Sequence, residues 1–148
     1  MTRHTRNVYT SNKKSDDFSS PAESQKLVTV DWQGDSKRAL RAFPDGIKGD
    51  LGYALERVQR GQIPPNRKVV REVGSGVYEL RDEDEKTWYR VLYTRRPNRI
   101  QVLHCFEKRS NSIEQKDIET AKARLRRVLE AEREEKKNAK QALHRRRT

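Results

Sequence analysis

Residues 76–124 decide the fold of this 148-residue chain, and they read GVYELRDEDEKTWYRVLYTRRPNRIQVLHCFEKRSNSIEQKDIETAKAR. Three short segments of this stretch are rich in the branched apolar and aromatic residues that strands favour, which predicts strands at 77–81, 87–94 and 100–107. Turn-forming residues separate them, first the acidic run 82–85 and then the sequence RRPN. The stretch therefore predicts three antiparallel strands joined by two hairpin turns.

A helix that closes the domain is predicted from about Gln115. Its apolar residues recur at helical spacing and form one stripe, which comprises Ile118, Ala121, Leu125 and Val128. Ahead of the strands, the sequence LVTVDW predicts a first strand from Leu27, and two helices are expected at 36–43 and 47–60. This order predicts an α+β domain with an N-terminal strand, two helices, a three-stranded antiparallel sheet segment and a C-terminal helix, all helices lying on one sheet face.

Composition divides the chain into three parts. Residues 1–26 are polar and predict a disordered tail, residues 27–130 hold the domain, and residues 131–148 are expected to form a basic helical extension or a tail. Lys and Arg number 34 against 22 Asp and Glu, which gives a formal net charge of +12. This balance favours a polyanionic partner such as nucleic acid, although the same charge also describes a solvated surface without a specific partner.

The chain carries a single cysteine and no apolar run long enough to span a bilayer, so we expect a cytosolic protein without a membrane partner. Cys105 lies within an apolar strand, where a reduced thiol packs as a small hydrophobic group rather than acting as a nucleophile. The Cys and His spacing resembles no metal site. We therefore expect neither a metal nor a cofactor.

Cations from separate strands are predicted to meet on one face of the sheet. Cleavage of RNA without a metal requires removal of a proton from the 2′-hydroxyl, stabilisation of charge at the phosphate, and a proton for the leaving 5′-oxygen. Arginine suits the second task because its fork binds two phosphate oxygens, and tryptophan stacks on a base. We assign catalysis to Arg81, Arg90, His104, Lys108 and Arg109, and substrate binding to Trp88, Arg95 and Arg96.

Three of these residues have structural alternatives. Arg81 and Arg90 also fit exposed strand residues that pair with the acidic run 82–85. His104 is expected on the same strand face as Val102 and Phe106, where it is either a packed residue or an acid or base beside the cations. Spacing alone leaves both pairs of readings open.

Four consecutive segments, VYELR, WYRVLYT, IQVLHCFEKR and DIETAKARL, resemble in order and spacing the phage-derived HigB-like branch of the RelE/ParE toxin superfamily. The resemblance implies a small RNase-fold toxin of a type II toxin–antitoxin pair that cleaves messenger RNA in the ribosomal A site. It implies a small helix-turn-helix antitoxin as partner, with operator DNA contacted only through the antitoxin complex.

By position, Arg81 and Arg90 match the basic sheet residues of that branch, and Lys108 with Arg109 match its basic pair after the last strand. His104 matches a histidine that often precedes an aromatic residue there. The chain departs from the pattern at SNSIEQ, where relatives usually show a Lys-Thr-Pro turn, and at Glu79, where better-known relatives carry a lysine.

Two other functions remain open at this point. One is a ParE-like inhibitor of DNA gyrase, which acts by binding protein and needs no catalytic cluster. The other is a nucleic-acid-binding protein without catalysis, whose basic tails supply the affinity. The basic set on the sheet favours RNA cleavage over gyrase inhibition.

Overall fold

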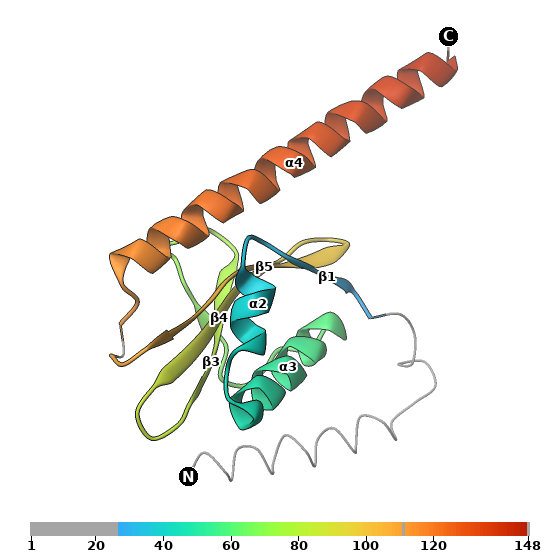
Figure 1. Ribbon diagram of the computed structural model, residues 1–148. Helices are drawn as coiled ribbons and strands as arrows, with labels where there is room; N and C mark the ends of the chain where they lie inside the picture. Colours follow the sequence, from blue (N-terminus) through green and yellow to red (C-terminus); the bar gives the residue numbers. More distant parts are fainter. Residues whose placement is uncertain (1–26, 111, 148) are drawn as a thin grey trace, which may run out of the picture.

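The computed structural model describes residues 27–110 and 112–147, so the expected tail at 1–26 lies outside the described residues. The chain forms an α+β domain, as predicted, with a long helix leaving it (Figure 1). In chain order the elements are β1 (Thr29–Trp32), α2 (Ser36–Arg41), α3 (Asp45–Gln59), β2 (Lys68–Val69), β3 (Val77–Glu83), β4 (Trp88–Arg95), β5 (Arg99–Lys108) and α4 (Gln115–Arg147).

The strands form one five-stranded sheet in the order β1-β5-β4-β3-β2. β1 runs parallel to β5, and all other neighbours are antiparallel. The β3–β4 turn is narrower than predicted, because β3 continues through Asp82 and Glu83. Asp84 closes this turn by accepting hydrogen bonds from the backbone N–H groups of Lys86 and Thr87, at 3.1 and 2.9 Å.

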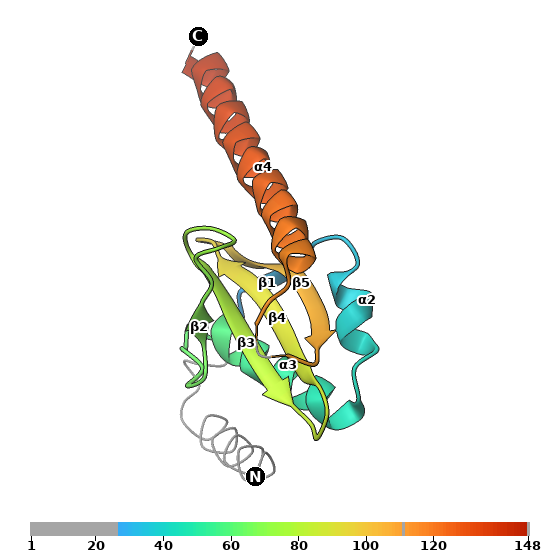
Figure 2. The ribbon, with the colours of Figure 1, turned by 90° about the vertical axis from the view of Figure 1, so that its left-hand side faces the viewer.

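Helices cover both faces of the sheet, which corrects the prediction that all of them lie on one face. One core packs α2 and α3 against strand residues that include Leu80, Val91 and Val102. On the opposite face, the predicted apolar stripe of α4 packs against Leu92 and Leu103. Figure 2 shows β3 and β4 in front of α3, with the first turns of α4 over one end of the sheet. The other end of that face, toward the β3–β4 turn, extends beyond α4.

A β-bulge in β5 decides which face His104 occupies. Leu92 pairs with His104 and the next residue, Tyr93, pairs with Val102, so Leu103 is an extra residue in β5. Val102 therefore belongs to the core beneath α2 and α3, whereas His104 stacks on Phe106 on the α4 side, with ring centroids 4.7 Å apart. The expectation that His104 shares a face with Val102 is wrong for this reason.

The sequence predicts either a helical extension or a tail after residue 130. Helix α4 continues to Arg147, so the described residues form the helical extension. The last anchor to the domain is Glu132, which accepts two hydrogen bonds of 2.7 Å from the Arg96 guanidinium in the β4–β5 turn. Such a bidentate pair fixes the direction of the helix as well as its position.

The Arg96–Glu132 pair predicts a stability loss in acid. Hydrogen bonding from Arg96 lowers the pKa of Glu132 below its ordinary value of 4.5. Because the folded-state pKa is the lower one, the contribution is complete above pH 4.5 and disappears as pH falls through the folded-state value. We expect Glu132→Gln to cost about 1 kcal/mol or less at neutral pH, and nothing in strong acid. Melting temperatures of both proteins against pH test this, with Glu130→Gln as the control; a difference that persists in strong acid contradicts it.

Candidate functional site

Three strands place polar side chains in rows on the α4-side face of the sheet, in the part that the helix does not cover. The strand register sets Arg81 of β3 opposite Arg90 of β4, and Trp88 of β4 opposite Lys108 of β5. Directly paired residues point to the same side of a sheet. We call Arg81, Trp88, Arg90 and Lys108 the cationic face. The prediction that these strands bring their cations to one face is confirmed for these residues.

Trp88 lies at the centre of the cationic face. The Arg81 guanidinium carbon is 4.8 Å from the centroid of its ring, and that of Arg90 is 6.0 Å away. Cation–π attraction therefore holds both guanidinium groups near one aromatic surface. Arg81 and Trp88 are half-buried, so both keep accessible surface.

Arg90 differs from the expected exposed cation. It is only 2% exposed and forms an ion pair with Glu79, which is 3% exposed. Glu79 lies diagonally across the two strands and outside the acidic run 82–85, so this ion pair was not among the alternatives considered from sequence. The carboxylate neutralises Arg90, so this buried guanidinium presents little charge to solvent.

Lys108 and Arg109 stand where β5 ends. Lys108 is buried and ion-paired with Glu114 of the loop before α4, and hydrogen bonding from Lys108 lowers the pKa of that carboxyl. Arg109 is exposed. Both line a hollow of about 660 Å³ between the end of α2, the end of β5 and the start of α4, where Phe43 supplies an aromatic wall. The hollow continues the cationic face toward the sheet edge.

His104 is held in a network beneath α4. Its Nε2 lies 2.8 Å from an Asp117 oxygen, and its Nδ1 lies 3.4 Å from Arg124 Nη1. A guanidinium only donates, so Nδ1 accepts and Nε2 carries the proton that it donates to Asp117. Arg124 also donates to the Leu103 carbonyl at 3.0 Å and to Asp35 at 3.0 Å. This geometry is that of a packed, hydrogen-bonded histidine; a role in proton transfer stays a prediction.

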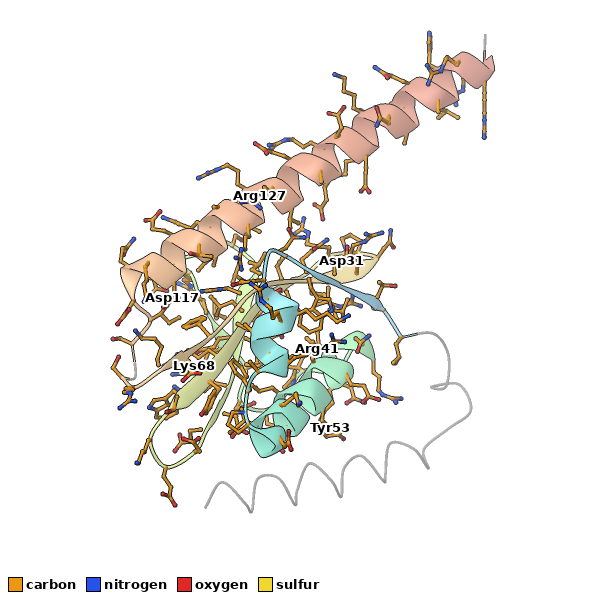
Figure 3. All side chains as sticks on the ribbon, in the orientation of Figure 1. Asp31, Arg41, Tyr53, Lys68, Asp117 and Arg127 are labelled. Carbon is orange, nitrogen blue, oxygen red and sulfur yellow. The ribbon has the colours of Figure 1, made fainter. Side chains whose placement is uncertain are left out.

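Asp117, labelled in Figure 3, carries one atom that the network does not use. Its second oxygen, Oδ2, is buried and makes no hydrogen bond to the described residues. Sequence reasoning missed both Asp117 and Arg124 as partners of His104. The available signal was that they lie two helical turns apart on α4 and so share a helix face.

Arg95 and Arg96 lie at the opposite end of β4 from Trp88. The strand has eight residues and so separates the two ends by roughly 24 Å. Arg96 is engaged with Glu132, and Arg95 is exposed beside the β4–β5 turn. The structure therefore does not bring these two arginines to the cationic face, because a hairpin places its turn residues at the far end of the strands.

Other kinds of site were sought in residues 27–110 and 112–147. These residues contain no group of three or more His, Cys, Asp or Glu side chains arranged to hold a metal ion. Cys105 is buried, and burial raises the pKa of its thiol to about 12, as expected for a packed cysteine. None of the helices in this part of the chain is long and apolar enough to cross a membrane.

Fold and site together define a small α+β protein with a mixed sheet, and the cationic face lies across strands β3, β4 and β5 of that sheet. The chain belongs to the family of phage-derived, Gp49-like proteins (DUF891), whose model matches residues 38–126. This match covers more than half of the chain and includes the whole cationic face. It ends within α4, before the helix leaves the domain. A comparison with curated proteins and one with solved structures found no significant match.

Proposed function

We propose that this protein is the toxin of a type II toxin–antitoxin pair and acts as a ribosome-dependent endoribonuclease on messenger RNA. The observation that carries the proposal is the Arg81–Trp88 contact on the part of the sheet that α4 does not cover. Lys108 of the neighbouring strand β5 lies directly opposite Trp88. A half-buried aromatic ring beside a guanidinium offers a stacking surface for a base next to a binding group for its phosphate. The HigB-like sequence resemblance and the Gp49-like family membership support the same proposal.

In the proposed reaction the 2′-hydroxyl loses its proton and its oxygen bonds to the adjacent phosphorus, which forms a 2′,3′-cyclic phosphate. The bond from phosphorus to the 5′-oxygen breaks, and that oxygen takes up a proton, so one proton is released and one is consumed. Arg81 stabilises the charge that develops on the phosphate oxygens. Trp88 orients the nucleotide by stacking. Arg90 supports the Trp88 ring through a cation–π contact, and the ion pair with Glu79 holds Arg90 in place. Lys108 and Arg109 bind the phosphate on the side of the hollow. The reaction as proposed uses no cofactor.

A second candidate is a nucleic-acid-binding protein of the same fold that does not cleave. Two observations favour it: Glu79 neutralises Arg90, and His104 is already hydrogen-bonded to Asp117. Both interactions occupy side chains, the Arg90 guanidinium and the His104 ring, that a catalytic site would use on its substrate. A ParE-like gyrase inhibitor remains the alternative within the superfamily.

The test is induced expression with mapping of 5′ ends on cellular transcripts. We expect growth arrest and new 5′ ends inside translated frames, which disappear when translation is blocked before induction. Co-expression of a neighbouring helix-turn-helix reading frame, the proposed antitoxin, should restore growth. Intact transcripts with DNA damage would instead identify a gyrase inhibitor, and normal growth with abundant folded protein would leave the non-catalytic binder.

A further inference from the structure

The outer part of α4 stands clear of the domain. Every residue from 133 to 147 is exposed, and the buried stripe of the helix ends at Val128. Figure 1 shows these turns projecting past the β4–β5 turn, and in Figure 3 their side chains radiate with no other element beside them. A helix segment that buries no face against its own domain has a surface available for a partner.

This projecting segment has a strongly biased charge. Residues 136–147 contain six Lys and Arg and no Asp or Glu. Lys136, Lys140 and Arg147 follow one another at helical spacing, with Lys137 beside them, and therefore share one side of the helix. We call these four residues the basic stripe. It is roughly 17 Å long, because each helical residue rises about 1.5 Å.

We propose that the basic stripe binds the phosphodiester backbone of base-paired RNA, without reading its sequence. A straight row of cations fits a ligand whose negative charges repeat along a line. The choice of RNA over DNA rests on the proposed function, which places the protein on the ribosome. The stripe lies outside residues 38–126, the part that the family's model matches, so it adds to the shared domain.

The other usual partners of a projecting helix fit less well. A helix that lies on a membrane needs a broad apolar face, and one that docks in a protein groove needs apolar anchors at i, i+3, i+4 and i+7. In the projecting segment Leu143 is the one large exposed apolar residue. The side opposite the basic stripe carries Asn138 and Ala142, which supply neither kind of face.

The position of the stripe separates it from the cationic face. Arg96 and Glu132 anchor α4 at the β4–β5 turn, whereas Trp88 lies at the β3–β4 end of the sheet. Two contacts at opposite ends of a rigid protein act together only on a large ligand, and each then raises the effective concentration of the other. Folded RNA around a translated message is such a ligand.

The test measures fluorescence anisotropy of a labelled RNA duplex titrated with the full-length protein from about 50 to 200 mM salt. The variant Lys136→Gln/Lys140→Gln/Arg147→Gln removes three positive charges from the stripe. We expect a plot of log affinity against log salt that is less steep by about 3, with binding about a thousandfold weaker at the lowest salt and a difference that shrinks as the salt concentration rises. Circular dichroism checks that the helix persists.

The matched control, Asn138→Glu/Ala142→Glu/Arg145→Gln, also lowers the net charge by three but on the opposite side of the helix. We expect a clearly smaller loss of affinity. Equal losses would show a general charge effect, and unchanged binding in the stripe variant would show a passive extension; either result overturns the proposal. Tighter binding of the wild type to a DNA duplex or to anionic vesicles than to RNA overturns the choice of partner.

Cleavage is measured separately, so the two proposals fail separately. Stripe-dependent binding without cleavage would contradict the proposed function and leave the RNA-binding stripe standing. The reason for placing the stripe on the ribosome would then no longer apply. Cleavage with no dependence of affinity on the stripe would overturn this inference alone.

Discussion

Replacing Arg81 by Ala is expected to lower the rate of messenger-RNA cleavage by about a hundred- to a thousandfold, the usual effect of removing one group that stabilises transition-state charge. Arg81 is half-buried and its guanidinium is stacked 4.8 Å from the Trp88 ring, so it can reach a phosphate beside a stacked base. The measurement is primer extension on a defined message in a translating extract, at matched concentrations of folded protein.

The control for this prediction is Arg95→Ala, which removes an exposed arginine from the far end of the same hairpin. It should cleave at nearly the wild-type rate. Arg81→Lys should fall between the two, because lysine keeps the charge and loses the two-pronged geometry. Wild-type cleavage by a folded Arg81→Ala protein would show that the cationic face is not the site of the reaction.

Sequence predicted those parts of the fold that depend on local periodicity. The alternating pattern places Trp88, Arg90 and Leu92 on one side of β4 and Tyr89, Val91 and Tyr93 on the other, as the two cores confirm. The apolar stripe of α4 was predictable for the same reason, since each helical turn returns a residue to the same side.

What sequence did not predict depends on contacts between distant elements. The bulge at Leu103 shifts the alternation of β5 by one residue and sends His104 to the α4 side, which no local pattern records. The covering of both sheet faces follows from which apolar stripe meets which strand. The predicted site failed in part where turn residues were included, because Arg95 and Arg96 are carried to the far end of the hairpin.

Glu79 is the most informative of these omissions. Strand alternation already placed it on the same side as Arg81, and the register makes it the diagonal neighbour of Arg90. In the alternative drawn from sequence, Arg90 was an exposed strand residue, and removal of an exposed cation costs little stability. The ion pair with Glu79 reverses that expectation, because a charge that is buried with its partner becomes costly when the partner is removed.

We therefore expect Arg90→Ala to destabilise the domain by about 3–5 kcal/mol, because it leaves the buried Glu79 carboxylate without its cation. Such a loss is a large share of the stability of a small domain. Arg90→Met should be nearly as damaging, whereas Glu79→Leu/Arg90→Met should recover most of the loss, since it removes both charges and keeps the volume. Equilibrium unfolding in urea measures all of them, and the single variant Glu79→Leu completes the double-mutant cycle.

The result decides how any loss of activity at Arg90 is interpreted. If Arg90→Met unfolds easily and Glu79→Leu/Arg90→Met folds well but does not cleave, the guanidinium is needed on the cationic face itself. If the double variant folds and cleaves, Arg90 acts only by balancing Glu79 and by supporting Trp88. A fully stable Arg90→Met protein would contradict the buried pair, because no compensation for the isolated carboxylate would then be required.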